Sequence, residues 1–236
     1  MQTNLRQSEV VPLGIGYYRV PEAARLLKTP ARNINRWLGG YSYKDSFGRT
    51  VKMGPLWKPQ LPKLGDAIEL GFRDLIELRF VLAFQKEKLG LNIIRSCFES
   101  ARTLVNDDRP FSTRRFQTDG KTIFLESLRE FGTSELVDLR SRQLVFKQVV
   151  EQTFRDLDIE DGAVSQWRPF NGKTSIVLDP TRAFGQPIAA EFGVATVTLA
   201  QAVQAEKSMD RVARLFEMPL SVVPDAVKFE HTLKAA

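Results

Sequence analysis

Cysteine and histidine are almost absent from this sequence of 236 residues. Cys97 is the one cysteine and His231 the one histidine. A single cysteine excludes an internal disulfide framework and is typical of a reducing compartment, so we expect a cytoplasmic protein. The scarcity of both residue types argues against a His/Cys zinc site, a Ser-His-Asp triad and a Cys-His nucleophile pair.

Long apolar runs and phosphate-binding loops are missing as well. No run reaches the roughly 18 apolar residues of a membrane span, and Met1 to Glu9 is too polar for a secretory leader. Gly14-Ile15-Gly16 is no dinucleotide fingerprint, because Arg19 stands where the third glycine belongs, and no Walker-type loop occurs. We therefore expect no membrane association, no metal, no cofactor and no enzymatic activity.

Positive charge is concentrated at the N-terminal end of the sequence. Residues 1–63 carry 11 Lys and Arg against three Asp and Glu, a net charge of +8, whereas residues 64–236 have a net charge of −2. A basic segment on a nearly neutral body suits a polyanionic partner such as nucleic acid. The alternative is a basic surface that only aids solubility.

Two short helices with a tight turn between them are predicted in this basic segment. Pro21 suits the first turn of a helix that ends near Leu27, and Lys28-Thr29-Pro30 breaks it. We expect Thr29 to cap a second helix, with Pro30 at its first position, which ends at Gly39-Gly40. Two short helices joined in this way form a helix-turn-helix.

The second helix has one apolar side and one polar side. Helical spacing places Ile34, Trp37 and Leu38 together, facing the first helix, and leaves the polar side chains outward. Arginine can fork onto guanine and asparagine onto adenine in the major groove. We therefore predict DNA contacts for Thr29, Arg32, Asn33, Asn35 and Arg36, although any exposed helix of a basic domain carries such residues.

A β-hairpin is predicted directly after this helix, with strands around Tyr41–Lys44 and Arg49–Lys52. A basic hairpin in this position would act as a wing. Its Lys44, Arg49 and Lys52 would then reach phosphates or the minor groove. The alternative is a plain connecting hairpin with solvated charges.

The middle of the chain, residues 64–171, is predicted to be helical with one hairpin. We expect a helix from Phe72 to Lys88 and a second one that buries Cys97 in its apolar stripe. Phe111–Leu125 is expected to form a hairpin with Asp119-Gly120 as its turn, and Leu144–Phe154 a helix. The acidic residues between 156 and 161 lack the pattern of an EF-hand and are expected to form a solvated loop.

Residues 172–236 are predicted to form a helical module. A short strand at Ser175–Leu178 precedes three helices, near Leu199–Glu206, Met209–Met218 and Val222–Leu233, with Ser208 and Ser221 as N-caps. The last two helices form a second helix-turn-helix-like pair. Its many outward acids favour a protein-binding surface over a DNA-binding one.

Two parts of the chain resemble known families. Residues 18–38 and the following hairpin resemble the DNA-binding domain of MerR-type regulators, with a similar Tyr-x-x-x-x-Ala start. Residues 174–233 resemble the small antitoxin modules that pair with PIN-like toxins. The resembling features include Ile176-Val177-Leu178-Asp179-Pro180, Gly185-Gln186-Pro187-Ile188 and Met209-Asp210-Arg211-Val212-Ala213. The combined layout is similar to the larger VapB-type antitoxins.

The sequence is thus interpreted as a mainly α protein with short β-hairpins (α+β) and three parts. These are a winged helix-turn-helix domain (1–63), a middle region for dimerisation (64–171) and a toxin-binding module (172–236). The resemblance implies an antitoxin that neutralises a PIN-like ribonuclease and, as a homodimer, binds operator double-stranded DNA to repress its own operon. The alternatives are a stand-alone MerR-like regulator that senses a small molecule and, far behind, an enzyme using the carboxylates of residues 156–161.

Overall fold

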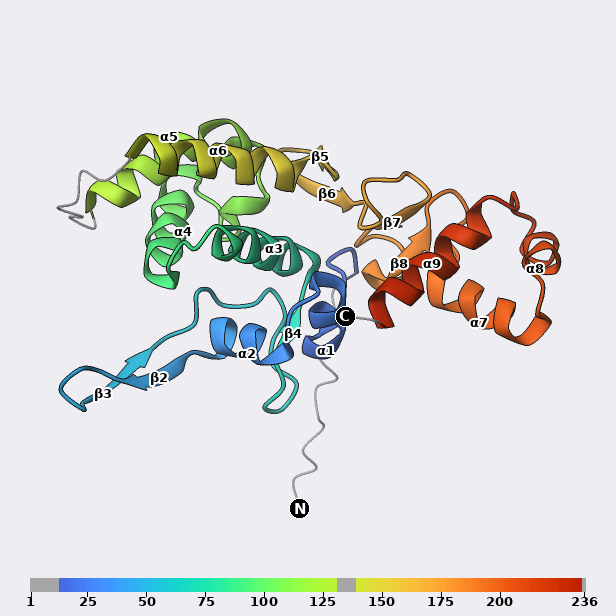
Figure 1. Cartoon of the computed structure of the whole chain (residues 1–236), viewed down its shortest axis with the longest axis horizontal. Helices are drawn as coiled ribbons and strands as arrows, with labels where there is room; N and C mark the ends of the chain where they lie inside the picture. The colour runs from blue at the N-terminus through green and yellow to red at the C-terminus, as the bar shows by residue number, and fades with distance from the viewer. Residues whose placement is uncertain (1–12, 131–138, 235–236) are drawn as a thin grey trace, which may run out of the picture.

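A computed structural model describes residues 13–130 and 139–234, so Met1 to Glu9 lie outside the described residues. Within these ranges helices predominate and the strands form small antiparallel sheets, in agreement with the predicted α+β class. One end of the molecule is a projecting hairpin of β2 (Tyr41–Lys44) and β3 (Thr50–Met53) (Figure 1). The opposite end consists of α7 (Thr196–Glu206), α8 (Met209–Leu215) and α9 (Val222–Lys234) (Figure 1).

The predicted N-terminal helix pair is present. Strand β1 (Tyr18–Arg19) leads into α1 (Val20–Leu27), and α2 (Ala31–Gly39) follows after a turn in which Lys28 has a φ of 52°. Pro21 lies in the first turn of α1, as expected. Ile34, Trp37 and Leu38 of α2 are all buried. The sequence pattern therefore identified both helices and the side on which the second one is anchored.

The start of α2 differs from the prediction. Pro30 and not Thr29 is the N-cap residue, and its carbonyl oxygen accepts a hydrogen bond from the backbone N–H of Asn33. Thr29 is buried, and its hydroxyl oxygen accepts a hydrogen bond from the side-chain amide of Asn33, 3.1 Å away. Because the backbone N–H of Thr29 bonds back to Ala24, Thr29 still belongs to the end of α1.

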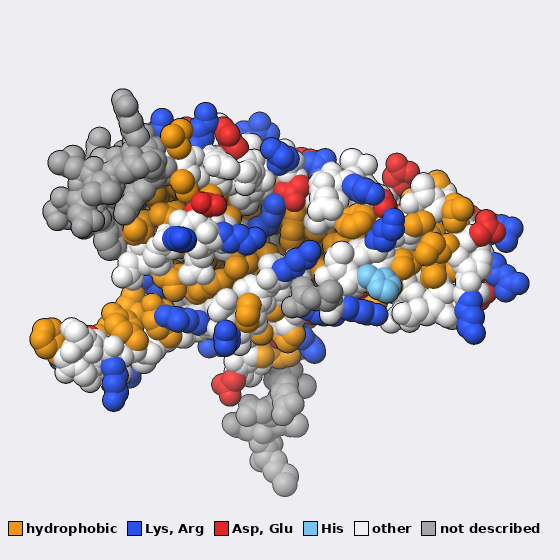
Figure 2. All heavy atoms as spheres, in the orientation of Figure 1, with side chains coloured by type: hydrophobic (Ala, Val, Ile, Leu, Met, Phe, Trp, Pro, Cys, Tyr) orange, Lys and Arg blue, Asp and Glu red, His pale blue; other side chains and the backbone are white. Residues whose placement is uncertain are grey.

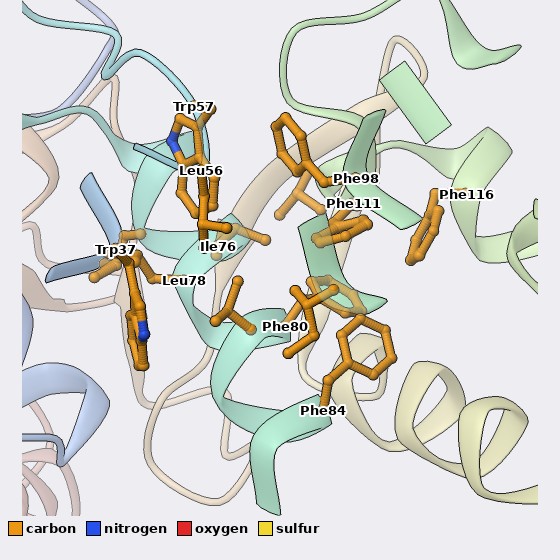
Figure 3. Close-up of a cluster of buried hydrophobic side chains, with 14 of the residues drawn as sticks. Trp37, Leu56, Trp57, Ile76, Leu78, Phe80, Phe84, Phe98, Phe111 and Phe116 are labelled. Atoms are coloured by element: carbon orange, nitrogen blue, oxygen red, sulfur yellow. The ribbon is translucent and has the colours of Figure 1, made fainter. Parts of the chain in front are cut away.

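The core is organised around α3 (Phe72–Lys86), a helix that is buried on nearly all sides. Strand β4 (Glu69–Leu70) leads into α3 and pairs with β1, which ties the helix to the N-terminal pair. Trp37 lies on one side of α3 and a cluster of phenylalanine rings lies on the other (Figure 3). Trp57 stacks on one of these rings, Phe98, with 5.1 Å between the ring centroids. Burying large aromatic side chains on both sides makes α3 the main source of hydrophobic stabilisation.

Two buried acids on α3 fix the segments around it. Asp74 accepts hydrogen bonds from the Trp57 indole, the backbone N–H groups of Gln60 and Gly71, and the Arg109 guanidinium. Glu77 accepts from the backbone N–H groups of Phe111 and Ser112. Burial raises the pKa of Glu77 to about 8, against the opposing effects of Arg73 and these hydrogen bonds. The two acidic side chains tie segments distant in sequence to one helix.

The hairpin predicted for Phe111–Leu125 is wrong. The short helix η1 (Pro110–Ser112) and the long helix α5 (Arg114–Glu130) occupy this stretch. The Thr113 hydroxyl oxygen accepts a hydrogen bond from the Phe116 backbone N–H and so starts α5. Gly120 lies in mid-helix, where a Cβ would make ordinary van der Waals contact with the ring of Phe146 at 3.4 Å. It is therefore a buried packing position inside a helix and not a turn residue.

The neighbouring helices agree with the predictions. Helix α4 (Leu91–Val105) buries Cys97 and Phe98, and α6 (Leu139–Phe154) contains the predicted Leu144–Phe154. Both pack against α5. Cys97 is therefore a core residue, as expected.

The acidic stretch after α6 is also corrected, from a solvated loop to a strand. Strand β5 (Leu157–Glu160) pairs with β6 (Ala163–Trp167), so the middle of the chain does contain a hairpin, but at a different place. Asp156 forms an ion pair with Arg79 of α3 and accepts a hydrogen bond from the Trp167 indole. Among the described residues no group of three potential ligands could hold a metal ion.

The C-terminal module, residues 172–236, begins with β7 (Ile176–Leu178) and β8 (Pro187–Ala189), which extend the β5-β6 hairpin to a four-stranded antiparallel sheet of order β5-β6-β7-β8. Helices α7, α8 and α9 enclose a core of their own, with Leu199, Val212 and Val223 fully buried. The Ser208 hydroxyl oxygen caps α8 as predicted, by accepting from the Arg211 backbone N–H. The three predicted helices are therefore confirmed.

The module packs against α1. The Tyr18 hydroxyl donates a 2.6 Å hydrogen bond to the carbonyl oxygen of Gly185, which belongs to the short helix η2 (Ala183–Gly185). Leu26 of α1 packs against a small buried cluster that includes Phe229 and Leu233 of α9. None of the helices in the described ranges is long and apolar enough to cross a membrane.

Candidate nucleic-acid interface

Helix α2 presents a row of exposed polar side chains on the side opposite its buried anchors. Arg32, Asn35 and Arg36 are exposed, whereas Ile34, Trp37 and Leu38 are buried. Trp37 is also held through its backbone, because its carbonyl oxygen accepts a hydrogen bond from the N–H of Leu56 at 2.7 Å. The exposed row is therefore carried by a helix that is fixed on its other side.

Thr29 and Asn33 are placed differently from the other three residues that sequence reasoning selected on the helix pair. Thr29 is buried, Asn33 is half-buried, and the two side chains are hydrogen-bonded to each other. The amide oxygen of Asn33 is not used in this bond. These two residues therefore support the start of α2 more than they extend its exposed surface.

Arg36 connects α2 to the hairpin. Its guanidinium lies over the ring of Tyr41, with 4.0 Å between the guanidinium carbon and the ring centroid. Such a cation–π contact holds the side chain without neutralising its charge. Arg36 is therefore oriented and still carries a full positive charge. Arg32 likewise has no ion-pair partner among the described residues, but no ring contact orients it there.

The hairpin joins α2 through Gly40. Gly40 has φ 79° and ψ 174°, a conformation that is essentially restricted to glycine. A Cβ at this position would lie 2.6 Å from the carbonyl oxygen of Met53. The close approach sets the position of the hairpin relative to α2.

The two faces of the hairpin have different chemistry. Ser42 pairs with Lys52 and Lys44 with Thr50, so the two lysines share one face, since side chains alternate along a strand. Tyr41, Tyr43, Val51 and Met53 share the other face, which is the one that Arg36 touches. Lys44 and Lys52 therefore lie on the face opposite the α2 contact, and both are exposed.

A rigid turn ends the hairpin. The Asp45 carboxylate accepts hydrogen bonds from the backbone N–H groups of Phe47 and Arg49, and pairs with the Arg49 guanidinium at 2.8 Å. These bonds lower the pKa of Asp45, chiefly the one from the Arg49 backbone. The charge of Arg49 is therefore partly compensated, and Phe47 is left 80% exposed at the tip.

Sequence reasoning did not select the aromatic residues of this arm. Tyr43 and Phe47 are exposed, and the Arg49 guanidinium lies 5.2 Å from the Phe47 ring centroid. Hydrophobic and basic side chains both gather on the projecting hairpin (Figure 2). The alternation of Tyr41 and Tyr43 along a predicted strand was the signal that could have indicated an aromatic face.

From Ala31 to Met53 the chain carries five basic residues and one acidic residue, a net charge of +4. Five of the predicted contact residues, Arg32, Arg36, Lys44, Arg49 and Lys52, supply all of this positive charge. The α2–hairpin unit is therefore a basic surface that combines the exposed guanidinium groups of Arg32 and Arg36, the exposed amide of Asn35 and exposed aromatic rings. These are groups that can contact phosphates and base edges.

The chain was compared with known protein sequences, solved structures and family models. The chain is 25% identical over 223 residues to a Mycobacterium tuberculosis protein named "Putative antitoxin VapB45", a match that spans 89% of this chain and 90% of that protein. The fold of this chain is similar to the crystal structure of Rv2018 from Mycobacterium tuberculosis, with a TM-score of 0.71 and 22% sequence identity. The match covers 92% of this chain and 99% of that one. No family model matches the chain.

The C-terminal module has a surface of another kind. Five of the 11 large hydrophobic side chains that are exposed in the described residues belong to it, namely Phe184, Val197, Met209, Leu215 and Leu220. The charged side chains of α8 are paired, Arg214 with Asp210 of the same helix and Arg211 with Glu206 at the end of α7. Exposed apolar groups among paired charges suit contact with a protein better than contact with a phosphate backbone.

Proposed function

We propose that this protein is the antitoxin of a type II toxin–antitoxin system, which neutralises a PIN-like ribonuclease and binds operator DNA to repress its own operon. The similarity to "Putative antitoxin VapB45" over nearly the whole chain supports the antitoxin role. The observation that carries the DNA-binding role is the exposed row of Arg32, Asn35 and Arg36 on a helix anchored by buried Trp37.

On DNA, α2 would act as the recognition helix of a winged helix-turn-helix. Its arginines would fork onto guanine, and Asn35 onto adenine, in the major groove. The hairpin would contact the adjacent backbone as a wing. Since Lys44 and Lys52 lie on the face away from Arg36, we assign them to phosphates and not to base edges.

Equilibrium binding to the DNA upstream of the protein's own gene tests these assignments. Arg32→Ala and Arg36→Ala are each expected to cost about 1–3 kcal/mol and to reduce the preference for that sequence over scrambled DNA. Arg155→Ala, an exposed arginine outside the proposed interface, is the matched control. Unchanged affinity in both α2 variants would refute the recognition helix.

The two lysines have a different expected signature. Lys44→Ala and Lys52→Ala should weaken binding to specific and scrambled DNA alike, and each should reduce the slope of log K against log salt by about 0.9. Loss of specificity without a change of slope would instead place these side chains on base edges.

We further propose that a homodimer places two α2 helices in successive major grooves, with half-sites about one helical turn, or a multiple of it, apart. The mass of the protein in solution and footprinting of the bound DNA test this arrangement. A monomeric protein that protects a single half-site would contradict it.

Toxin binding is assigned to the C-terminal module, residues 172–236. In the full-length chain, Leu215→Arg should prevent co-purification of a ribonuclease encoded beside this protein's gene, because it replaces one of the module's exposed apolar side chains with a charge. Leu64→Arg changes an equally exposed leucine elsewhere and is the control. Retention of the ribonuclease by the Leu215 variant, with DNA affinity unchanged in both, would refute the assignment of Leu215.

A stand-alone regulator that senses a small molecule is the second candidate. One observation favours it: a cavity of about 240 Å³ lies between α1 and the C-terminal module. Co-purification of a ribonuclease that the protein inhibits would support the antitoxin. Absence of any such partner, together with DNA affinity that depends on a small molecule, would support the regulator.

A further inference from the structure

The cavity of about 240 Å³ is formed where two distant parts of the chain meet. Helix α1 and its approach provide Glu22, Arg25 and Leu26, and the module provides Val197, Glu230 and Leu233. Leu26 and Leu233 also belong to the small apolar cluster that holds the two parts together. The cavity is therefore bounded by packed elements and does not depend on a single surface loop.

Glu230 is the unusual residue of this cavity. Its side chain lies on α9 and the residue is only 8% exposed. Its Oε1 accepts a hydrogen bond from the Thr196 hydroxyl, but no described residue donates to its Oε2 and no cation pairs with it. Glu230 lines the cavity, and its unpaired Oε2 is not fully buried. A carboxylate can accept about four hydrogen bonds, and this one has capacity left for a donor in the cavity.

The surroundings of Glu230 are negative in spite of the basic character of the chain. Glu22 lines the same cavity, and its carboxylate is already used by the backbone N–H of Arg19. The pKa of Tyr18, another lining residue, is raised first by burial and then by the negative charges of Asp179 and Glu22. Arg25 is the cation among the lining residues, but it is exposed, so water screens its charge.

We propose that this cavity binds a small organic cation, a protonated amine on a compact apolar body. The ammonium group donates to the Oε2 of Glu230, as a charge-assisted hydrogen bond in a partly dehydrated site. The apolar body packs against Leu26, Val197 and Leu233. A volume of about 240 Å³ is below the usual range of pockets for drug-sized ligands, so the site suits a molecule of fewer than about a dozen heavy atoms.

The place of this site in the fold gives the ligand two neighbours. Helix α1 packs against α2, and the other wall of the cavity is α9 of the C-terminal module. A bound amine therefore bridges the helix that supports the basic surface and the module. Ligand binding itself requires neither the DNA-binding nor the antitoxin role, so its test is independent of both.

The test uses the full-length protein with two probes of equal size. Benzylamine is protonated at pH 7, whereas benzyl alcohol is its neutral counterpart. Calorimetry and thermal denaturation should show benzylamine binding with a Kd in the low-millimolar range and a rise in Tm, with at least tenfold weaker binding of benzyl alcohol. Equal binding of the two probes, or no binding of benzylamine up to about 10 mM, would overturn the proposal.

Variants locate the bound amine. Glu230→Gln keeps an oxygen that can accept from Thr196 but removes the charge, and should weaken benzylamine binding at least tenfold. Glu191→Gln, a change of an exposed carboxylate outside the cavity, should leave it unchanged. Val197→Phe fills the cavity from its rim, leaves Glu230 unchanged in sequence, and should also abolish binding. This second variant keeps the test valid if Glu230→Gln does not fold. Wild-type affinity in the Val197 variant would place the amine elsewhere.

Discussion

Gly40→Ala is expected to detach the β2–β3 hairpin from its position beside α2. Alanine at φ 79° and ψ 174° costs about 1–3 kcal/mol, because this backbone region is essentially restricted to glycine. In addition, its Cβ would lie 2.6 Å from the Met53 carbonyl oxygen, a distance that backbone atoms cannot tolerate. The cheapest relief is a movement of the hairpin, since α2 is fixed by buried Trp37 and Leu38.

The effect on DNA binding can be estimated from the charges on the hairpin. Lys44 and Lys52 form no ion pair with any residue that the structure describes, whereas the charge of Arg49 is partly compensated by Asp45. A displaced hairpin should therefore lose about two phosphate contacts and reduce the salt slope by about 2. Fluorescence anisotropy with labelled DNA over a series of salt concentrations measures this slope, and thermal denaturation measures the loss of stability.

Gly65→Ala is the matched control for Gly40→Ala. Gly65 also has a positive φ, 62°, but a Cβ there would meet nothing within 4 Å, and the residue lies outside the hairpin. The Gly65→Ala variant should therefore lose some stability but keep the wild-type slope of log K against log salt. The reasoning would be refuted if Gly40→Ala kept the wild-type slope, or if both variants lost it equally.

Three further predictions concern stability. Tyr18→Phe should lower the free energy of unfolding, measured by chemical denaturation, by about 1–3 kcal/mol, because the buried Gly185 carbonyl oxygen loses its donor. Tyr43→Phe, at an exposed position, should leave it unchanged, and equal effects of the two changes would contradict the prediction. Gly120→Ala should be neutral or stabilising through helix propensity, but Gly120→Val should cost about 1–3 kcal/mol in thermal denaturation because it overpacks the contact with Phe146, and equal Tm values would contradict this. The raised pKa of Glu77 means that the protonated side chain stabilises the fold below about pH 4.5 and that this stabilisation is lost as the pH rises through about 8. Between these limits the wild type should therefore lose on the order of 4 kcal/mol of stability relative to Glu77→Gln, and a difference independent of pH would contradict it.

The elements that could be predicted from the sequence were those defined by local signals. Pro21, Pro30 and Gly40 delimit the helix pair, and the spacing of Ile34, Trp37 and Leu38 showed which side is buried. The exposure of Arg32 and Arg36 followed from the same periodicity. Their DNA contacts stay a prediction until binding is measured.

The errors came from signals that depend on distant partners. Asp119-Gly120 looks like a hairpin turn, but Phe116, Ile123 and Phe124 lie at helical spacing and are buried against α4 and α6. The acidic stretch looked solvated because the partner of Asp156 is Arg79, 77 residues away in sequence. Thr29 looked like a cap because serine and threonine commonly cap helices, whereas its side chain is buried at the end of α1.

The cavity at Glu230 could not be predicted from the sequence at all. Its walls come from residues near 20 and near 230, and nothing local relates Glu22 to Glu230. The aromatic face of the hairpin was accessible in principle, because alternation along a strand depends only on position.

The hydrogen bond between Tyr18 and Gly185 joins residues 167 positions apart in sequence. During synthesis, α1 therefore emerges long before the segment that completes its surroundings. Leu26 packs against the main core as well, but its contact with the cluster of Phe229 and Leu233 forms only after α9 has been made and has folded. The N-terminal helix pair thus acquires its full stability only when the C-terminal end of the chain is in place, and contacts of such long range are slow to form. In a ribosome-bound fragment that ends before residue 172, α1 should consequently be less stable than in the full-length protein.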